Sequence, residues 1–173
     1  MSKVKGMKKV SKKVGKILRK EFGVEKTIFA DTYMYDFNSD SVYFKITHAI
    51  EDEMFNRFMN ERFGLKLNAE SGFIFSLLHE VGHRENNEDV EGAVFDFCLA
   101  EKARIEEEIQ SNPDLTFDEL YALESQYFNL PDEIMATAWA VDFYKKNPKK
   151  CAKMHKKIAK TLQKFYKMNN FEG

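Results

Sequence analysis

Apolar residues recur three or four positions apart along most of this 173-residue chain, which is the spacing of one helical face. Glycine, asparagine and proline residues interrupt this pattern and mark where helices begin and end. The predicted helices cover residues 7–22, 50–63, 69–85, 89–110, 116–127, 131–146 and a last segment from residue 148. Asn68 is the expected N-cap of the third helix, and Thr116 with Glu119 forms a capping box for the fifth.

Two short segments follow a different pattern. Residues 27–37 and 42–47 are rich in β-branched and aromatic side chains, and Asn38-Ser39-Asp40-Ser41 between them supplies turn-forming residues. Together they predict a β-hairpin. The expected fold class is therefore α+β and mostly helical, with a small antiparallel sheet packed on the helix over residues 69–85.

That helix carries the candidate chemistry, because residues 79–83 read His-Glu-Val-Gly-His. His79 and His83 lie one turn apart on one face, so both rings can ligate one Zn²⁺, with Glu80 beside the metal-bound water. The preceding residues 73–78 are mostly apolar, which predicts a buried helix. A buried helix seldom carries two histidines and a glutamate unless they are paired or ligate a metal. The motif therefore indicates a zinc site with Glu80 as general base; the alternative is two histidines on a solvated face.

A catalytic zinc ion needs a third protein ligand. Glu133 is the preferred candidate, because it lies in the first turn of the helix that begins at Pro131. Small residues follow it on the same face, so that this helix can pack closely against the helix over residues 69–85. Glu91 and Glu124 are the fallback candidates.

The two patterns together, H-E-x-G-H and a later E-x-x-A-x-x-aromatic-A, resemble the zincin metallopeptidases and in particular the ImmA/IrrE-like group. The resemblance covers residues 27–144 and implies a minimal zincin-like fold. By position it implies His79, His83 and Glu133 as ligands and Glu80 as the base. One departure is Thr137, where the group usually has Asn or Asp. The other is a longer interval between the motifs, which implies an inserted helical segment over residues 87–129. Whether this segment is a lid, a substrate platform or packing stays open.

The expected reaction is hydrolysis of a peptide bond by a zinc-bound water that Glu80 activates. A further donor should stabilise the oxyanion, and Tyr127, Tyr144 and His155 are the candidates, although a core role is the more ordinary interpretation of His155. The resemblance also implies that a strand edge holds an extended substrate. Residues 42–47 or 28–33 could supply that edge, or the hairpin could only cover the core.

Charge is distributed unevenly along the chain. Residues 1–20 carry +9, residues 21–144 carry −19 and residues 145–173 carry +9. We expect one domain in three parts: a basic amphipathic helix over 1–22, a metallopeptidase core over 23–147 and a basic C-terminal helix over 148–173 packing on the core. The basic ends could dock on the acidic core, make weak nucleic-acid contacts or touch a membrane surface.

Compartment and partners follow from weaker signals. The chain has no apolar run long enough to cross a membrane and no signal-peptide pattern. Its two cysteines, Cys98 and Cys151, have no metal-ligand spacing and indicate reduced core thiols in a cytoplasmic protein. The leading hypothesis is a cytoplasmic zinc metalloendopeptidase acting on a protein or peptide, which by the resemblance could be a DNA-binding regulator. A phage-related effector would use the same chemistry. The alternative is a non-catalytic regulatory protein on a zincin scaffold, with structural zinc and a protein or DNA partner.

Overall fold

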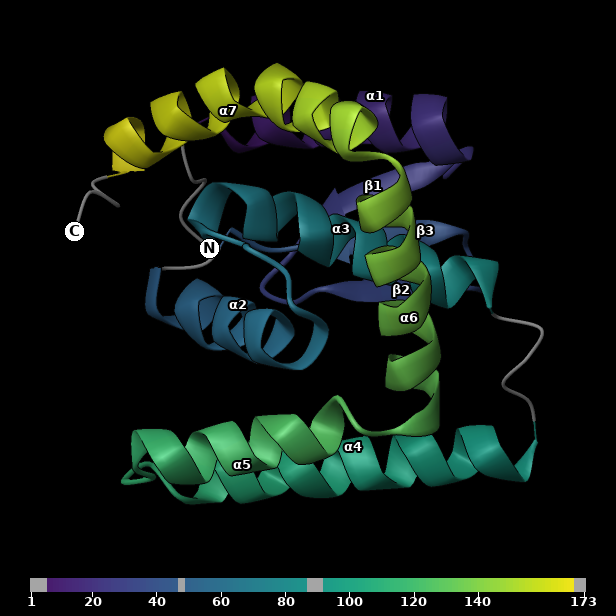
Figure 1. Cartoon of the computed structure of the whole chain (residues 1–173), viewed down its shortest axis with the longest axis vertical. Helices are drawn as coiled ribbons and strands as arrows, with labels where there is room; N and C mark the ends of the chain where they lie inside the picture. The colour runs from purple at the N-terminus through teal and green to yellow at the C-terminus, as the bar shows by residue number, and fades with distance from the viewer. Residues whose placement is uncertain (1–5, 47–48, 87–91, 170–173) are drawn as a thin grey trace.

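The computed structural model describes residues 6–46, 49–86 and 92–169, and the elements below belong to these ranges. Figure 1 shows three levels, with α6 running between the outer two. In chain order, the elements are α1 (Met7–Phe22), β1 (Lys26–Phe29), β2 (Met34–Asp36), β3 (Ser41–Phe44), α2 (Ala49–Phe63), α3 (Ala69–Glu85), α4 (Ala93–Ser111), α5 (Phe117–Tyr127), α6 (Pro131–Lys146) and α7 (Pro148–Asn169). The mostly helical α+β class is confirmed.

The small sheet is mixed, so the prediction of a purely antiparallel hairpin is only partly right. β3 lies in the centre, with β2 antiparallel on one side and β1 parallel on the other. The turn between β2 and β3 is stabilised by Asp36, which accepts hydrogen bonds from the Asn38 amide at 3.0 Å and the Ser39 hydroxyl at 2.6 Å. The predicted strand over 27–37 splits in two, because β1 packs against α1 and the chain then crosses to the far edge of β3.

α3 is the central helix of the molecule, as its apolar sequence predicts. Its buried side chains are Phe73, Ile74, Phe75, Leu77, Leu78 and Val81. The expected N-cap is confirmed: Asn68 accepts a hydrogen bond from the Ser71 amide at 2.9 Å, and the Ser71 hydroxyl lies 2.9 Å from the Asn68 amide. The capping box of Thr116 and Glu119 at α5 is also present. α3 therefore begins at a fixed point and brings its C-terminal half to the candidate site.

The two basic helices, α1 and α7, pack side by side on one face of the core (Figure 1). Each buries an apolar stripe: Val10, Val14, Ile17 and Leu18 in α1, and Cys151, Met154, Ile158, Leu162 and Phe165 in α7. Glu21 lies 3.4 Å from Lys150 and 3.5 Å from Lys157. Both helices are thus anchored by their apolar faces. None of the described helices is both long enough and apolar enough to span a membrane.

Candidate metal centre

The backbones of α3 and α6 touch where the two helices cross. A Cβ atom added to Gly82 would lie 2.3 Å from the carbonyl oxygen of Ala136 and 2.9 Å from its Cα. Glycine is thus required on α3, since any side chain would force the helices apart. Asn86 ties the same two backbones, donating to the Gly82 carbonyl at 2.7 Å and to the Met135 carbonyl at 3.3 Å. This α3–α6 crossing sets how far Glu133 stands from the histidines.

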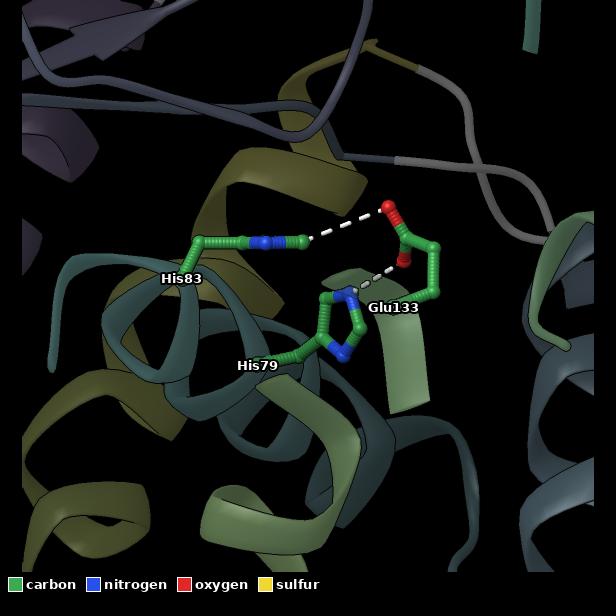
Figure 2. A group of neighbouring side chains, drawn as sticks. All are labelled: His79, His83 and Glu133. Carbon is green, nitrogen blue, oxygen red and sulfur yellow. Dashed lines mark hydrogen bonds and ion pairs between the residues drawn. The ribbon is translucent and has the colours of Figure 1, made fainter. Parts of the chain in front are cut away.

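The crossing brings His79, His83 and Glu133 together, and Figure 2 shows both rings turned toward the carboxylate. His79 Nε2 lies 2.8 Å from Glu133 Oε2, and His83 Nε2 lies 3.3 Å from Glu133 Oε1. One ligand atom from each of the three residues lies within 4.8 Å of the others. Tetrahedral Zn²⁺ with bonds of about 2.0–2.1 Å separates its ligand atoms by about 3.3 Å. The cluster therefore fits a metal ion, and two histidines with one glutamate is a known catalytic zinc set.

Thr137 supports this cluster from behind. Its hydroxyl lies 3.1 Å from His79 Nδ1, the ring nitrogen that faces away from Glu133. Thr137 is one helical turn after Glu133 and is equally buried, so α6 contributes both the carboxylate and the partner that orients the first ring. Thr137, which stands where the ImmA/IrrE-like group usually has Asn or Asp, thus keeps a polar group beside His79.

Glu80 lies beside the cluster on α3 and is 4% exposed. The pKa of Glu80 is raised to about 7: burial and the nearby Glu133 carboxylate raise it, while His79, Lys102 and a backbone hydrogen bond from Tyr35 oppose the shift. A carboxyl group with a pKa near 7 is suited to accepting and returning a proton. In Glu133, burial acts to raise the pKa, but the neighbouring His83 and His79 hold it well below its usual range. Glu133 is therefore the ionised acid of the pair.

Sequence reasoning missed Lys102, which reaches the cluster from α4. Its ammonium lies 2.5 Å from Glu133 Oε1 and 2.5 Å from Asp132 Oδ2, and its side chain is 18% exposed. Burial lowers the pKa of Lys102, but Glu133 and Asp132 more than offset this, and the net shift is upward. The signal was present in the sequence. Lys102 lies on the same helical stripe as Phe95 and Leu99, and a lysine on an apolar stripe calls for a buried partner.

The structure separates the three candidates for an oxyanion donor. Tyr127 lines the cavity beside the cluster, and its pKa is raised by burial and by the charges of Glu133 and Glu80. Tyr144 instead packs against Phe75 with ring centroids 5.8 Å apart, and neither Tyr144 nor His155 lines the cavity. Helical spacing gives the face of a residue and not the depth at which its helix passes the site, so Tyr127 is the candidate that the structure brings to the cavity.

The structure also locates the fallback metal ligands, the candidate substrate edges and the cysteines. Glu124 lines the cavity but is not part of the metal-ligand cluster, and Glu91 lies outside the described residues. Of the two candidate substrate edges, residues 42–47 are excluded, because β3 is the central strand and is paired on both sides, whereas residues 28–33 include the end of β1, which is an edge strand. The edge next to Glu80 is β2. Both cysteines are buried and free, and neither joins the cluster.

A cavity of about 830 Å³ opens over the cluster. His79, His83, Glu80 and Glu133 lie in its wall, so that a molecule in the cavity can reach all four. Much of the remaining wall comes from β2, α2, α4 and α5. Comparison with protein-family models, with curated proteins and with solved structures yields no match for this chain. The site is therefore interpreted from its own geometry.

Proposed function

We propose that this chain is a zinc-dependent metalloendopeptidase of the zincin type, similar to the ImmA/IrrE-like group, and that it hydrolyses peptide bonds of a protein substrate. The observation that carries the proposal is the arrangement of one glutamate, Glu80, beside a His-His-Glu cluster in the wall of an open cavity. A structural zinc site has no need of Glu80 or of an open side. The regulatory alternative leaves this buried carboxyl group without a role.

Each residue then has a distinct task. His79, His83 and Glu133 would hold Zn²⁺, which when bound supplies a Lewis acid that activates water and polarises the scissile carbonyl. Glu80 accepts the proton of the attacking water and delivers it to the leaving amine. Tyr127, which lines the cavity beside the cluster, would donate its hydroxyl to the negative charge on the carbonyl oxygen, and the Lys102 ammonium, which is paired with Glu133, would hold that carboxylate in position.

The setting of the enzyme is part of the same proposal. The buried free thiols of Cys98 and Cys151 support a reducing, cytoplasmic compartment. A DNA-binding regulator as substrate rests on the family resemblance alone. The exposed lysines of α1 and α7 would give such an enzyme a salt-dependent affinity for nucleic acid.

Replacing Glu80 by glutamine tests the proposal most directly. We expect Glu80→Gln to bind one zinc per chain like the wild type and to lose about 10²–10⁴-fold of its rate on a fluorescently labelled unfolded protein such as casein. Glu107→Gln, at an exposed acid of α4 that does not line the cavity, is the control and should keep its rate. Chelation should abolish wild-type cleavage, and added zinc should restore it. Full cleavage by Glu80→Gln, or a wild type that takes up no zinc, would refute the proposal.

A further inference from the structure

The α4–α5 hairpin, formed by Ala93–Ser111 and Phe117–Tyr127, stands away from the core along much of its length (Figure 1). Side chains bridge the gap at separate points. Near α6, Lys102 contacts Asp132 and Glu133. Toward α2, the Tyr121 hydroxyl donates to Glu61 at 2.8 Å, and the guanidinium of Arg57 lies 5.3 Å from the Tyr121 ring centroid. The cavity lies between these bridges, so the hairpin forms its outer wall.

The hairpin turns one continuous stripe from each helix toward this cavity. The stripe of α4 consists of Phe95, Leu99, Lys102, Glu106 and Ile109, and that of α5 consists of Leu120, Tyr121, Glu124 and Tyr127, with Phe128 directly after the helix. Both follow helical spacing, and most members are apolar. Leu99 remains 50% exposed even though it faces the cavity. An apolar stripe that faces an open cavity is the ordinary form of a binding surface for an apolar group.

Opposite the hairpin, Phe55 and Phe58 of α2 contribute aromatic rings to the same cavity. Phe128 packs on both, with ring centroids 5.6 and 5.3 Å away. It also lies 6.0 Å from the His79 ring. The apolar wall is therefore continuous with the metal-ligand cluster, and a group held there is adjacent to the reacting atoms.

The charged residues of the cavity wall also bear on the type of side chain that the cavity can take. The ionisable residues of the wall, besides the two histidines and the tyrosines, are the acids Glu80, Glu106, Glu124, Asp132 and Glu133 and the bases Lys45 and Lys102. The ammonium of Lys102 is already paired with Asp132 and Glu133. Because Zn²⁺ would offset two of these acids, charge disfavours an acidic side chain only weakly, and it is the apolar stripes that favour a large hydrocarbon one.

We propose that the α4–α5 hairpin is the specificity wall of the enzyme, and that the cavity between it and the metal-ligand cluster takes a large aliphatic or aromatic side chain of the peptide next to the scissile bond. This inference rests on the proposed peptidase function. It assigns the inserted segment the role of a substrate platform, the role that its sequence alone left open. Leu99 is the specificity-determining residue, because it is the exposed apolar side chain that faces the cavity from the middle of α4.

Binding to a non-cleaving protein tests this inference separately from catalysis. The probes are dye-labelled peptides of one Gly/Ser sequence that carry a single Ala, Leu or Phe, and their affinity for zinc-loaded Glu80→Gln is measured by fluorescence anisotropy. We expect the Leu and Phe peptides to bind roughly tenfold or more tightly than the Ala peptide. A second substitution, Leu99→Trp, should reduce that difference, because the larger ring would occupy the part of the cavity next to α4. The matched control is Val94→Trp on the same helix, which is 47% exposed and does not line the cavity, and it should leave the difference intact.

Cleavage of a peptide library by wild type and Leu99→Ala supplies the second measurement. The wild type should select large apolar residues beside the cleaved bond, and the wider cavity of Leu99→Ala should shift the selection toward larger ones. Equal binding of the three peptides, or equal effects of Leu99→Trp and Val94→Trp, would overturn the inference while cleavage upholds the proposed function. Selective binding without any cleavage would refute the peptidase proposal and retain the apolar binding site.

Discussion

The α3–α6 crossing and the α4–α5 hairpin form opposite walls of one cavity, but they are built in different ways. At the crossing, helix backbones touch at Gly82 and Ala136, and the candidate metal ligands project from this contact. The hairpin meets the core through individual side chains and leaves space between them. The difference indicates a division of labour: the crossing fixes the geometry of the chemistry, and the hairpin shapes the cavity and reaches the ligand Glu133 through Lys102.

The largest expected effect comes from cutting the ionic bridge between these two parts. Lys102→Met leaves Asp132 and Glu133 buried without their cation, and breaking a buried pair costs about 3–5 kcal/mol. Because the Lys102 side chain is 18% exposed, we expect about 3 kcal/mol less free energy of unfolding in the metal-free protein. Zinc would replace part of the lost positive charge, so the loss should be smaller in the loaded protein.

Urea unfolding with and without zinc measures both values. Lys153→Met, on the exposed side of α7, is the control and should change the free energy of unfolding by less than about 0.5 kcal/mol. If Lys102→Met costs the same with and without zinc, the lysine is not linked to the metal cluster, and the hairpin is independent of the crossing.

A methyl group at the crossing itself should give the next largest effect. Gly82→Ala places a Cβ against backbone atoms of Ala136, which cannot turn aside as a side chain can. We expect a loss of roughly 2–3 kcal/mol in the free energy of unfolding and weaker zinc binding, because the helices must separate. Gly15→Ala in α1 is the matched control. Its new Cβ would lie 3.4 Å from the Thr27 hydroxyl, and helix propensity should stabilise it by up to about 1 kcal/mol.

Thermal unfolding and chelator competition give the two readouts for this pair of variants. If Gly82→Ala unfolds at the wild-type temperature and binds zinc equally well, the close contact of α3 and α6 is not what holds the ligands in place.

The same contrast explains what the sequence could predict. His79, His83 and Glu80 share one helix, so their arrangement follows from helical spacing alone. The apolar pattern likewise predicted a buried α3, and its N-cap and the α5 capping box follow from local chemistry. The prediction of Glu133 required one further step. The small residues that follow it allow its helix to pack closely against another helix, and this brings a glutamate in the first turn close to the histidines.

Contacts between elements were not predictable in this way. β1 pairs directly with β3, although β2 comes between them in the sequence. β1 also packs on α1, and a hairpin pattern does not encode this contact. Lys102 joins the cluster only because the hairpin folds back toward α6. Tyr144 lies on the same face of α6 as Glu133, but three turns further along the helix. There it packs against Phe75 and not against the metal-ligand cluster.

The smallest predicted effect concerns a polar contact inside the crossing. Thr137→Val keeps the shape of the side chain and removes the hydroxyl that lies 3.1 Å from His79 Nδ1. Loss of a partner that orients a ligating histidine typically weakens metal binding by about 10–100-fold. We expect the lower end, near tenfold, because the packing of the helix still restrains the ring. Thr137→Ser, which retains the hydroxyl, should bind zinc within about threefold of the wild type. Competition with a chromogenic chelator measures all three affinities. If Thr137→Val binds zinc as tightly as the wild type, the hydroxyl does not matter at this position, and the crossing acts on the metal cluster through packing alone.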